Sequence, residues 1–294
     1  MCAEEQKYSR QILAFGKEGQ NKISEVKVGV VGLGGMGSAI AQMLAYLGVK
    51  RFILIDDDIV DETNLNRLIG ATIKDVENKS AKTEIARKLI KSINPDARIT
   101  TYQNLKDEVS LDVLSNEPDI IFGCVDNDSA RLILTELCAA FEKVLIDSAT
   151  EIFVEENYFG GRVVFAIPKE FCLKCAGQID FNIAQQELES KEEKTFRVKH
   201  GYGLGPHVPA PAIVSVNGII AGLAVTEFVV YITKVRKPNK RVTYKGMKAD
   251  VNVINESLDK IIPGCYYCDY LAGKRELANI KRYSKNDLPS DLPE

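Results

Sequence analysis

The stretch "VVGLGGMGSAIAQ", residues 30–42, decides the fold of this chain. An apolar run rich in valine, "KVGVVGLG" (27–34), leads into it and predicts a buried strand. The segment "MGSAIAQMLAYLGV" (36–49) predicts a helix that ends near Gly48. The glycines between strand and helix follow the spacing G-x-G-x-x-G, which is typical of loops that hold phosphates at the start of a helix.

Each glycine of this loop has a predicted role. Gly32 permits the tight turn after the strand, and Gly37 lets the helix pack close to that strand. Gly34 and Gly35 leave room for phosphate or ribose to contact the backbone. Asp56 follows at the end of the next predicted strand, where an acid binds ribose hydroxyls. The alternative is that the glycines only form a turn, but the order of strand, helix and acid favours a nucleotide.

Alternating strands and helices predict the fold class, an α/β Rossmann-like, doubly wound and mostly parallel sheet. After residue 150 the pattern changes. Two extended runs within 151–168, joined by "NYFGG", and a strand pair at 241–254 indicate an antiparallel C-terminal extension. The other predicted elements are strands at 51–58, 98–103 (an outer strand), 119–126 and 143–150, and helices at 7–24, 79–95, 129–142 and 213–232.

Seven cysteines fall into two classes. Three are scattered, and four form the C-x-x-C pairs Cys172/Cys175 and Cys265/Cys268. Four thiolates suit a tetrahedral, structural Zn²⁺ site, provided that the fold brings the pairs together. A redox dithiol is the alternative, but neither pair lies at a strand–helix junction of the thioredoxin type.

These features predict four segments of the chain. They are an N-terminal helical segment (1–25), a nucleotide-binding Rossmann-like domain (26–168), the crossover loop, helix and zinc-closed C-terminal part of the same domain (169–272), and a polar tail (273–294).

Composition and charge exclude several classes of function. Hydrophobic residues make up 45% and charged residues 27%, as in ordinary globular proteins. The net charge of -3 gives no general attraction to nucleic acid or to an anionic membrane. The first ten residues lack the apolar core of a signal peptide. Thr226 and Glu227 interrupt the longest apolar run (219–232), which therefore predicts a buried helix and not a membrane span. We expect a cytoplasmic protein.

Up to Asp56, NAD and ATP fit the loop equally well. The following stretch, "DDDIVDETNLNR" (56–67), contains Asn64, Asn66 and Arg67, and Lys82 comes at the start of the next helix. The two phosphates of a dinucleotide have little need for such an array. A triphosphate attacked at its α-phosphorus needs cations, because negative charge builds up on the departing pyrophosphate. The array therefore favours ATP.

Carboxylates near the same sheet edge predict a Mg²⁺ site. Asp126 ends the predicted strand "IIFGCVD" and is a plausible single protein ligand, with Asp58 as a second candidate. Mg²⁺ needs only one or two protein carboxylates, because phosphates and water supply the other ligands.

With these residues in place, the chain resembles the MoeB/ThiF/HesA family, the bacterial and archaeal relatives of ubiquitin-activating enzymes. The matching segments are "YSRQI" (8–12), "GLGGMGS" (32–38), "DDDIVDETNLNR" (56–67), Lys82 ahead of "INP" (93–95), "CVDN" (124–127) and both C-x-x-C pairs. Leu68 departs from the family, which usually has Gln after the arginine. Because that amide is not a phosphate ligand, we expect little effect.

The resemblance implies an adenylyltransferase. The family uses Mg·ATP to adenylate the C-terminal glycine carboxylate of a ubiquitin-like or sulfur-carrier protein that ends in Gly-Gly. It implies a homodimer, in which Arg10 reaches the phosphates of the neighbouring subunit. It also implies that the four cysteines close a structural zinc site away from ATP. The residues that would hold ATP and metal are Gly35, Asp56, Asn64, Arg67, Lys82, Asp126 and, from the "CVDN" match, Asn127.

Relatives that form a thioester place a cysteine in the crossover before the helix at 213–232. Here that segment, "VKHGYGLGPHVPAPA" (198–212), has no cysteine, and its His200 and His207 are interpreted as loop polarity without chemistry. Cys124 and Cys138 are expected to be packing residues. The prediction is therefore an enzyme that stops at the acyl-adenylate.

Several alternatives stay open at this point. They are a full activating enzyme with an unexpected thioester cysteine, an enzyme that adenylates a tRNA-linked or peptide carboxylate, an inactive scaffolding subunit, and an NAD-dependent oxidoreductase. The acidic balance argues against RNA. The retained cations argue against a scaffold, which has no physical need for them.

Overall fold

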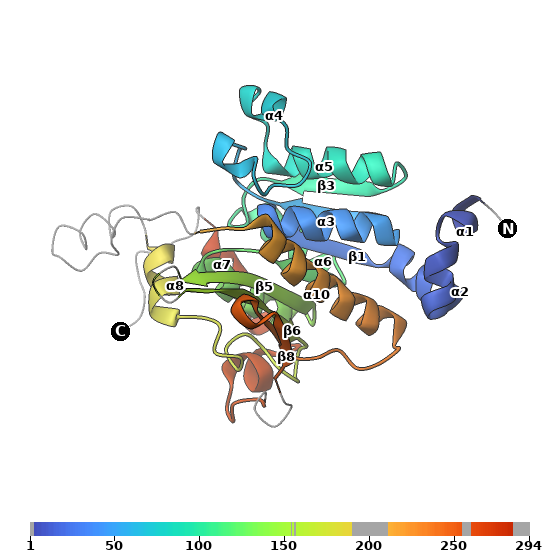
Figure 1. The fold of residues 1–294 in the computed structure, drawn as a ribbon. Helices are drawn as coiled ribbons and strands as arrows, with labels where there is room; N and C mark the ends of the chain where they lie inside the picture. The colour runs from blue at the N-terminus through green and yellow to red at the C-terminus, as the bar shows by residue number, and fades with distance from the viewer. Residues whose placement is uncertain (1–2, 154, 156, 190–210, 255–259, 285–294) are drawn as a thin grey trace.

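A computed structural model describes residues 3–153, 155, 157–189, 211–254 and 260–284 (Figure 1). The predictions for Cys2, for His200 and His207, and for most of the charged cluster "ESKEEK" (189–194) fall outside these residues.

The described residues form one eight-stranded sheet in the order β3-β2-β1-β4-β5-β6-β7-β8. The first five strands in this order pair in parallel, and β6, β7 and β8 add antiparallel pairs. This arrangement confirms the predicted Rossmann-like fold with its antiparallel C-terminal extension. The strands are β1 (Lys27–Val31), β2 (Arg51–Ile55), β3 (Arg98–Tyr102), β4 (Ile120–Gly123), β5 (Val144–Phe153), β6 (Tyr158–Ala166), β7 (Arg241–Lys245) and β8 (Asp250–Val253).

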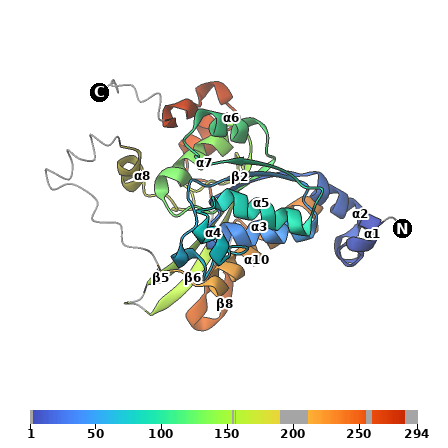
Figure 2. The same ribbon diagram turned by 90° about the horizontal axis from the view of Figure 1, so that it is seen from above.

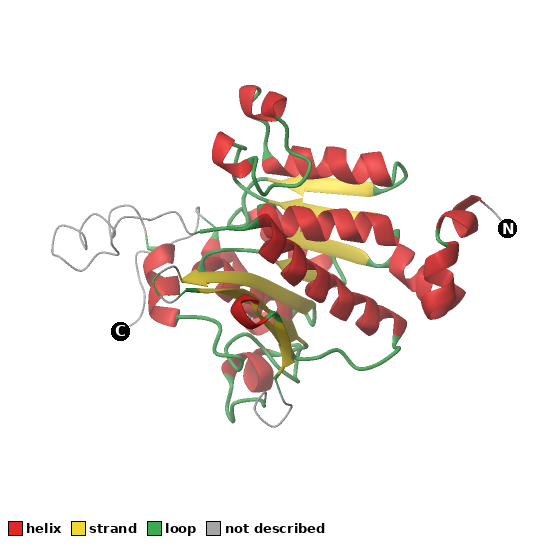
Figure 3. Ribbon diagram, in the orientation of Figure 1, coloured by secondary structure: helices red, strands yellow, loops and turns green. Residues whose placement is uncertain are grey.

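Helices cover both faces of this sheet, as the ribbons show (Figures 2 and 3). One face carries α3 (Gly35–Leu47), α5 (Lys82–Ile93) and α10 (Val214–Thr233), and the other carries α6 (Glu108–Asn116), α7 (Asp128–Ala140) and α8 (Phe181–Leu188). The remaining helical elements are α1 (Ala3–Lys7), α2 (Ser9–Glu25), η1 (Glu62–Asn64), α4 (Ile73–Glu77), η2 (Gly246–Lys248), η3 (Tyr266–Leu271), η4 (Arg275–Leu277) and η5 (Ile280–Tyr283).

The strands are apolar on both faces because helices bury both. Along β4, Phe122 packs into the core under α3 and α10, whereas Ile121 packs into the second core under α7. Successive side chains of a strand point to opposite faces, so continuous apolar runs are expected in a doubly covered parallel sheet. The carboxyl ends of the parallel strands are left as the polar edge, where such sheets bind ligands.

Helix α10 is long and apolar enough to span a membrane by length and composition alone. In the fold it lies along α3 and over β5 and β6, with half of the tested window buried, as core helices of the same composition do. Phe228 of α10 meets Phe122 of β4 with ring centroids 5.7 Å apart. The helix is therefore a structural part of the first core.

The predicted hairpin at 151–168 is present but is placed differently. The strand expected at 143–150 and the first run of the hairpin are one continuous strand, β5. Most of "NYFGG" belongs to β6 and not to the turn. A Cβ on Gly160 would lie 2.2 Å from the Tyr244 carbonyl oxygen, and one on Gly161 would lie 2.5 Å from that of Ala149. These glycines let β6 approach its neighbouring strands closely. In the sequence they resemble a turn, so this role was not predicted.

We expect Phe228→Ala to destabilise the fold by about 3–5 kcal/mol, because the side chain is fully buried and its removal leaves a cavity between α10 and the sheet. Urea unfolding measures the change. Phe153→Ala is the matched control, since this ring is 49% exposed at the end of β5 and its loss is expected to have an effect below about 1 kcal/mol. Equal effects of the two substitutions would contradict the assigned role of α10.

Candidate functional site

The glycine loop is built by close contacts that leave no room for side chains. Gly32 has a positive φ of 85°, and a Cβ on it would lie 2.4 Å from the Cys124 carbonyl oxygen. A Cβ on Gly37 would lie 1.8 Å from the Gly32 carbonyl oxygen. At Gly34, the N-cap of α3, a Cβ would meet nothing within 4 Å. The loop is thus closed toward the protein and open at the helix N-terminus, where free N–H groups attract anions.

Asp56 ties this loop to the end of β2. Its carboxylate accepts hydrogen bonds from the Leu33 N–H (2.5 Å) and from the Asp58 N–H (3.0 Å). Burial raises the pKa of the Asp56 carboxyl, while the Leu33 N–H and the nearby Lys82 charge oppose that rise. The acid that was predicted to bind ribose therefore also fixes the position of the glycine loop.

Lys82 and Asp58 lie beside each other at the same edge. The Lys82 Nζ is 2.5 Å from the Asp58 Oδ2, and the Lys82 N–H donates to the Asp58 carbonyl oxygen (3.0 Å). The lysine side chain is 12% exposed and the aspartate side chain is 63% exposed. Asp58 also shares with Asp56 and Asp57 a group of carboxylates whose oxygens all lie within 4.8 Å. The sequence placed a cation and a second acid here, and the structure brings them into one ion pair.

The segment after β2 carries Asn64 and Arg67. Asn64 is buried, donates to the Asp61 carboxylate (3.1 Å), and has a buried Oδ1 without a partner among the described residues. The Arg67 guanidinium donates to the Thr63 carbonyl oxygen and to the Asn66 side chain. Its aliphatic stem lies 3.3 Å from the point that a Cβ on Gly35 would occupy. Arg67 therefore lies against the glycine loop.

Asp126 lies in the segment after β4. Its exposed carboxylate accepts a hydrogen bond from the Asn127 amide (3.3 Å). Asn127 is the N-cap of α7, since its Oδ1 accepts from the Ala130 N–H (2.8 Å). The cap gives Asn127 a structural role and leaves Asp126 with open coordination, as a Mg²⁺ ligand requires.

Arg10 lies away from all these residues. It is exposed on α2, and its neighbour Gln11 donates to the carbonyl oxygen of Tyr46 at the C-terminal end of α3. The 13 residues of α3 span roughly 20 Å between that end and the glycine loop. The structure therefore separates Arg10 from the phosphate loop of its own chain.

A buried ionic network lies under Asp126 and was not predicted. Asp147, fully buried within β5, accepts a hydrogen bond from Arg162 of β6 (2.6 Å). The Arg131 Nε lies 3.7 Å from the other Asp147 oxygen, and the Arg131 guanidinium donates to the Val125 carbonyl oxygen (2.9 Å). Arg131 thus anchors the backbone next to Asp126, and Asp147 anchors Arg131. The sequence signal was a charged residue directly after the apolar run "VLI".

A second unpredicted residue is Asn217 of α10, which is 4% exposed. Its Nδ2 lies 2.3 Å from the point that a Cβ on Gly35 would occupy. The sequence feature that could have pointed to Asn217 is an amide side chain within the apolar run "IVSVNGII". Since α10 is far from the glycine loop in sequence, only the fold reveals this contact.

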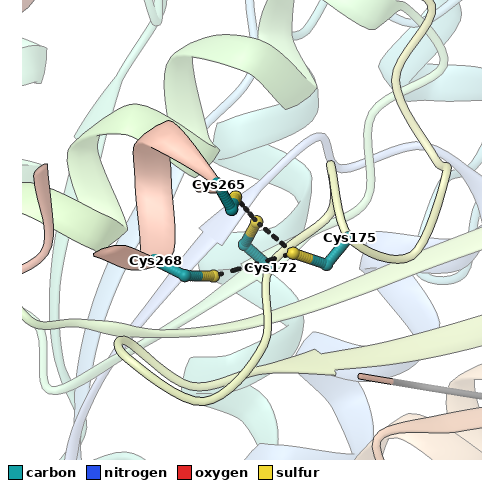
Figure 4. A group of neighbouring side chains, drawn as sticks. All are labelled: Cys172, Cys175, Cys265 and Cys268. Atoms are coloured by element: carbon teal, nitrogen blue, oxygen red, sulfur yellow. Dashed lines mark hydrogen bonds between the residues drawn. The ribbon is translucent and has the colours of Figure 1, made fainter. Parts of the chain in front are cut away.

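The two C-x-x-C pairs meet in one cluster (Figure 4). The Sγ of Cys172 lies 3.7 Å from that of Cys175 and 3.6 Å from that of Cys265, and the Cys175 and Cys268 Sγ atoms lie 3.8 Å apart. These separations are far longer than a disulfide bond of about 2.05 Å. All four sulfurs lie within 4.8 Å of one another, as ligands of one tetrahedral metal ion do.

The cluster favours deprotonation of Cys172, whereas the hydrogen bond to Cys172 and burial raise the pKa of Cys268. The hydrogen bond from Cys268, helped by the other two thiols, lowers the pKa of Cys172 to about 6, whereas burial raises the pKa of Cys175 to about 12. A bound metal ion would remove the remaining protons. The four-cysteine cluster is therefore a candidate structural zinc site. It packs into the core under α7, whereas the glycine loop leads into α3 on the opposite face.

The described cysteines outside the cluster are poor nucleophiles. Burial raises the pKa of both Cys124 and Cys138. Because the thiolate is the reactive form, neither thiol is activated for attack.

Taken together, an open helix N-terminus, the Asp56 carboxylate and the cations Arg67 and Lys82 lie near the carboxyl ends of β1 and β2, with Asp126 after neighbouring β4. This arrangement can bind a nucleotide and stabilise charge on its phosphates.

Several known proteins are similar to this chain in sequence. Ubiquitin-like modifier-activating enzyme 5 of Dictyostelium discoideum is 29% identical over 257 residues, which are 82% of this chain and 62% of that protein. The sulfur carrier protein ThiS adenylyltransferase of Escherichia coli is 32% identical over 174 residues, 58% of this chain and 66% of that protein. The chain thus spans less than two thirds of the length of these curated relatives.

Solved structures with the same fold include E. coli MccB with ATP, which has a TM-score of 0.68 and 22% identity and covers 89% of this chain and 74% of that chain. MccB in complex with N-formylated MccA has a TM-score of 0.70 and 23% identity and covers 91% of this chain and 77% of that chain. The sequence matches the ThiF family over residues 8–261. The chain, with its glycine loop and its first cysteine pair inside the matched region, belongs to the ThiF family.

Proposed function

We propose that this chain uses ATP and Mg²⁺ to adenylate the C-terminal glycine carboxylate of a ubiquitin-like or sulfur-carrier protein that ends in Gly-Gly. The observation that carries the proposal is the convergence of the glycine loop, Asp56 and Lys82 at one sheet edge in a chain of the ThiF family. Relatives named as an adenylyltransferase of a sulfur carrier and as a modifier-activating enzyme support the substrate class.

The proposed reaction needs no general base. The attacking carboxylate is ionised at neutral pH, and its oxygen forms a bond to the α-phosphorus of ATP. The bond from that phosphorus to the bridging oxygen breaks, and pyrophosphate leaves with the electron pair. Lys82 and Arg67 would stabilise the charge on the departing group, and Asp126 would hold the Mg²⁺ that neutralises the phosphates. Positioning and charge therefore account for the chemistry.

The ion pair of Lys82 with Asp58 fits this role. Because the Asp58 side chain is largely exposed, water or a metal ion can replace the lysine as its partner when phosphates arrive. The raised pKa values of Cys124 and Cys138 support an enzyme that stops at the acyl-adenylate.

A homodimer would complete the site by placing Arg10 at the phosphates of the partner. Apolar side chains exposed on helices α2, α3 and α10, which pack against one another, support this assembly. They are Leu13, Tyr46 and Ile219.

We also propose that the four-cysteine cluster binds one Zn²⁺ ion. The cluster offers four ligands and no open position, so the metal would stabilise the fold and take no part in the reaction.

We expect Lys82→Ala to lower carrier-dependent ATP–pyrophosphate exchange by about 10²–10³-fold, because the substitution removes a charge that stabilises the transition state. Small proteins that end in Gly-Gly serve as candidate carriers. Lys88→Ala is the control, since this lysine lies on the same helix with an exposed side chain and pairs with Asp75. Undiminished exchange in Lys82→Ala protein would refute the catalytic assignment.

A mixing experiment tests Arg10. Arg10→Ala and Asp126→Ala chains are each expected to be inactive. If Arg10 acts across the dimer, co-refolded chains regain about a quarter of wild-type exchange, because half of the dimers are mixed and each holds one intact site. No regained activity would mean that both residues serve the same chain.

Metal analysis tests the cluster. Purified protein is expected to contain about one zinc per chain, and Cys265→Ser to lose it and to unfold about 5 °C or more below the wild type. Cys138→Ala, which removes a buried thiol outside the cluster, should keep its zinc. Zinc-free wild-type protein, or a full zinc content in Cys265→Ser, would rule the site out.

A further inference from the structure

Helix α10 places two buried polar side chains next to apolar core residues. Both carboxylate oxygens of Glu227 accept hydrogen bonds, which Arg236 and Asn239 donate. Asn217 differs. It is 4% exposed, and no hydrogen bond joins its side-chain amide to another described residue. An amide without a hydrogen-bond partner is unfavourable in a side chain this buried, so an apolar side chain would suit the fold at this position better.

The amide points at the glycine loop. Its Nδ2 lies 2.3 Å from the point that a Cβ on Gly35 would occupy, and the Arg67 stem lies 3.3 Å from the same point. Gly35 begins α3, whose first-turn N–H groups have no partner within the helix. The space beside Gly34 is open. A helix N-terminus, a cation and an unmatched amide thus converge on one small region.

We propose that Asn217 is a phosphate ligand of this chain: its amide N–H donates to a phosphate oxygen of the nucleotide held on the glycine loop. The inference rests on the proposed use of ATP and adds a binding residue to it. The donor character is what matters. A phosphate oxygen accepts hydrogen bonds, so an aspartate of the same shape would repel the ligand, and a leucine would leave one phosphate contact unmade.

Three variants separate a ligand from a packing residue. Asn217→Leu keeps the branched shape without the donor, Asn217→Asp replaces the donor by a charged acceptor, and Asn217→Ser keeps a small polar group in case the larger change prevents folding. Asn21→Asp adds the same charge at an exposed position of α2 and is the matched control. Binding of ATP and, separately, of adenosine is measured by calorimetry and by thermal shift, together with the KM for ATP in the exchange assay.

Asn217→Leu is expected to weaken ATP binding and raise the KM for ATP about tenfold or more, because the lost hydrogen bond is made to a charged group. Asn217→Asp should weaken ATP binding further, and Asn217→Ser should fall between Asn217→Leu and the wild type. Adenosine, which has no phosphate, should bind all variants within about twofold of the wild type, and Asn21→Asp should bind both ligands normally.

Wild-type affinity for ATP in all three variants would overturn the inference while leaving the proposed function intact. An equal loss of ATP and adenosine binding would make Asn217 a packing residue and would overturn it as well. Failure of the wild-type chain itself to bind ATP would refute the proposed function together with this inference.

Discussion

The site depends on the contact between the first turn of α3 and the carbonyl oxygen of Gly32. Gly37 makes the contact possible because it has no side chain, and any Cβ there would collide with that oxygen. The contact fixes where α3 begins, and with it the direction of the helix N-terminus. The Leu33 N–H donates to Asp56 from this loop conformation, so Asp56 and the glycine loop are positioned together. Asn217 in turn lies against Gly35 because α10 packs along α3. One close backbone approach therefore sets the geometry of loop, acid and amide.

Much of the fold could be predicted because local sequence determines it. The apolar runs at β1, β2 and β4 are strands covered on both faces, and Gly48 ends α3 in a left-handed conformation as expected of a C-cap. The predicted turn between the two runs of 151–168 was misplaced, because glycine is common both in turns and where two strands pack closely. Gly160 and Gly161 resemble a turn signal but serve close strand packing. Short α4, α6 and α8 were not predicted, and the predicted polar tail (273–294) contains Ile280 and Tyr283, which are buried against the second core. Such burial depends on distant partners that no local pattern shows.

The candidate site divides in the same way. Residues that follow strands in parallel order, such as Asp56 and Asp126, could be assigned to one edge because the topology brings strand ends together. Asn217, Arg162 and Asp147 could not, because their significance lies in contacts between segments far apart in the sequence. The role of Arg10 was implied only by family resemblance. Its distance from the glycine loop arises because the two lie at opposite ends of α3. Sequence therefore identifies the candidate ligands at the sheet edge better than the residues that hold them in place.

The cysteine cluster has a consequence for the order in which the protein is made. It brings Cys172 next to Cys265, 93 residues further on, and so closes a loop that contains α8, α10 and β7. The second pair is synthesised only after α8, α10 and β7, the elements within that loop. The nascent chain must therefore hold α10 against the sheet without this closure, by the packing of side chains such as Phe228 alone. Closing so long a loop at the end removes more chain entropy from the unfolded ensemble than a short closure would. Ion capture would then follow the packing of α10 and would lock a topology already reached.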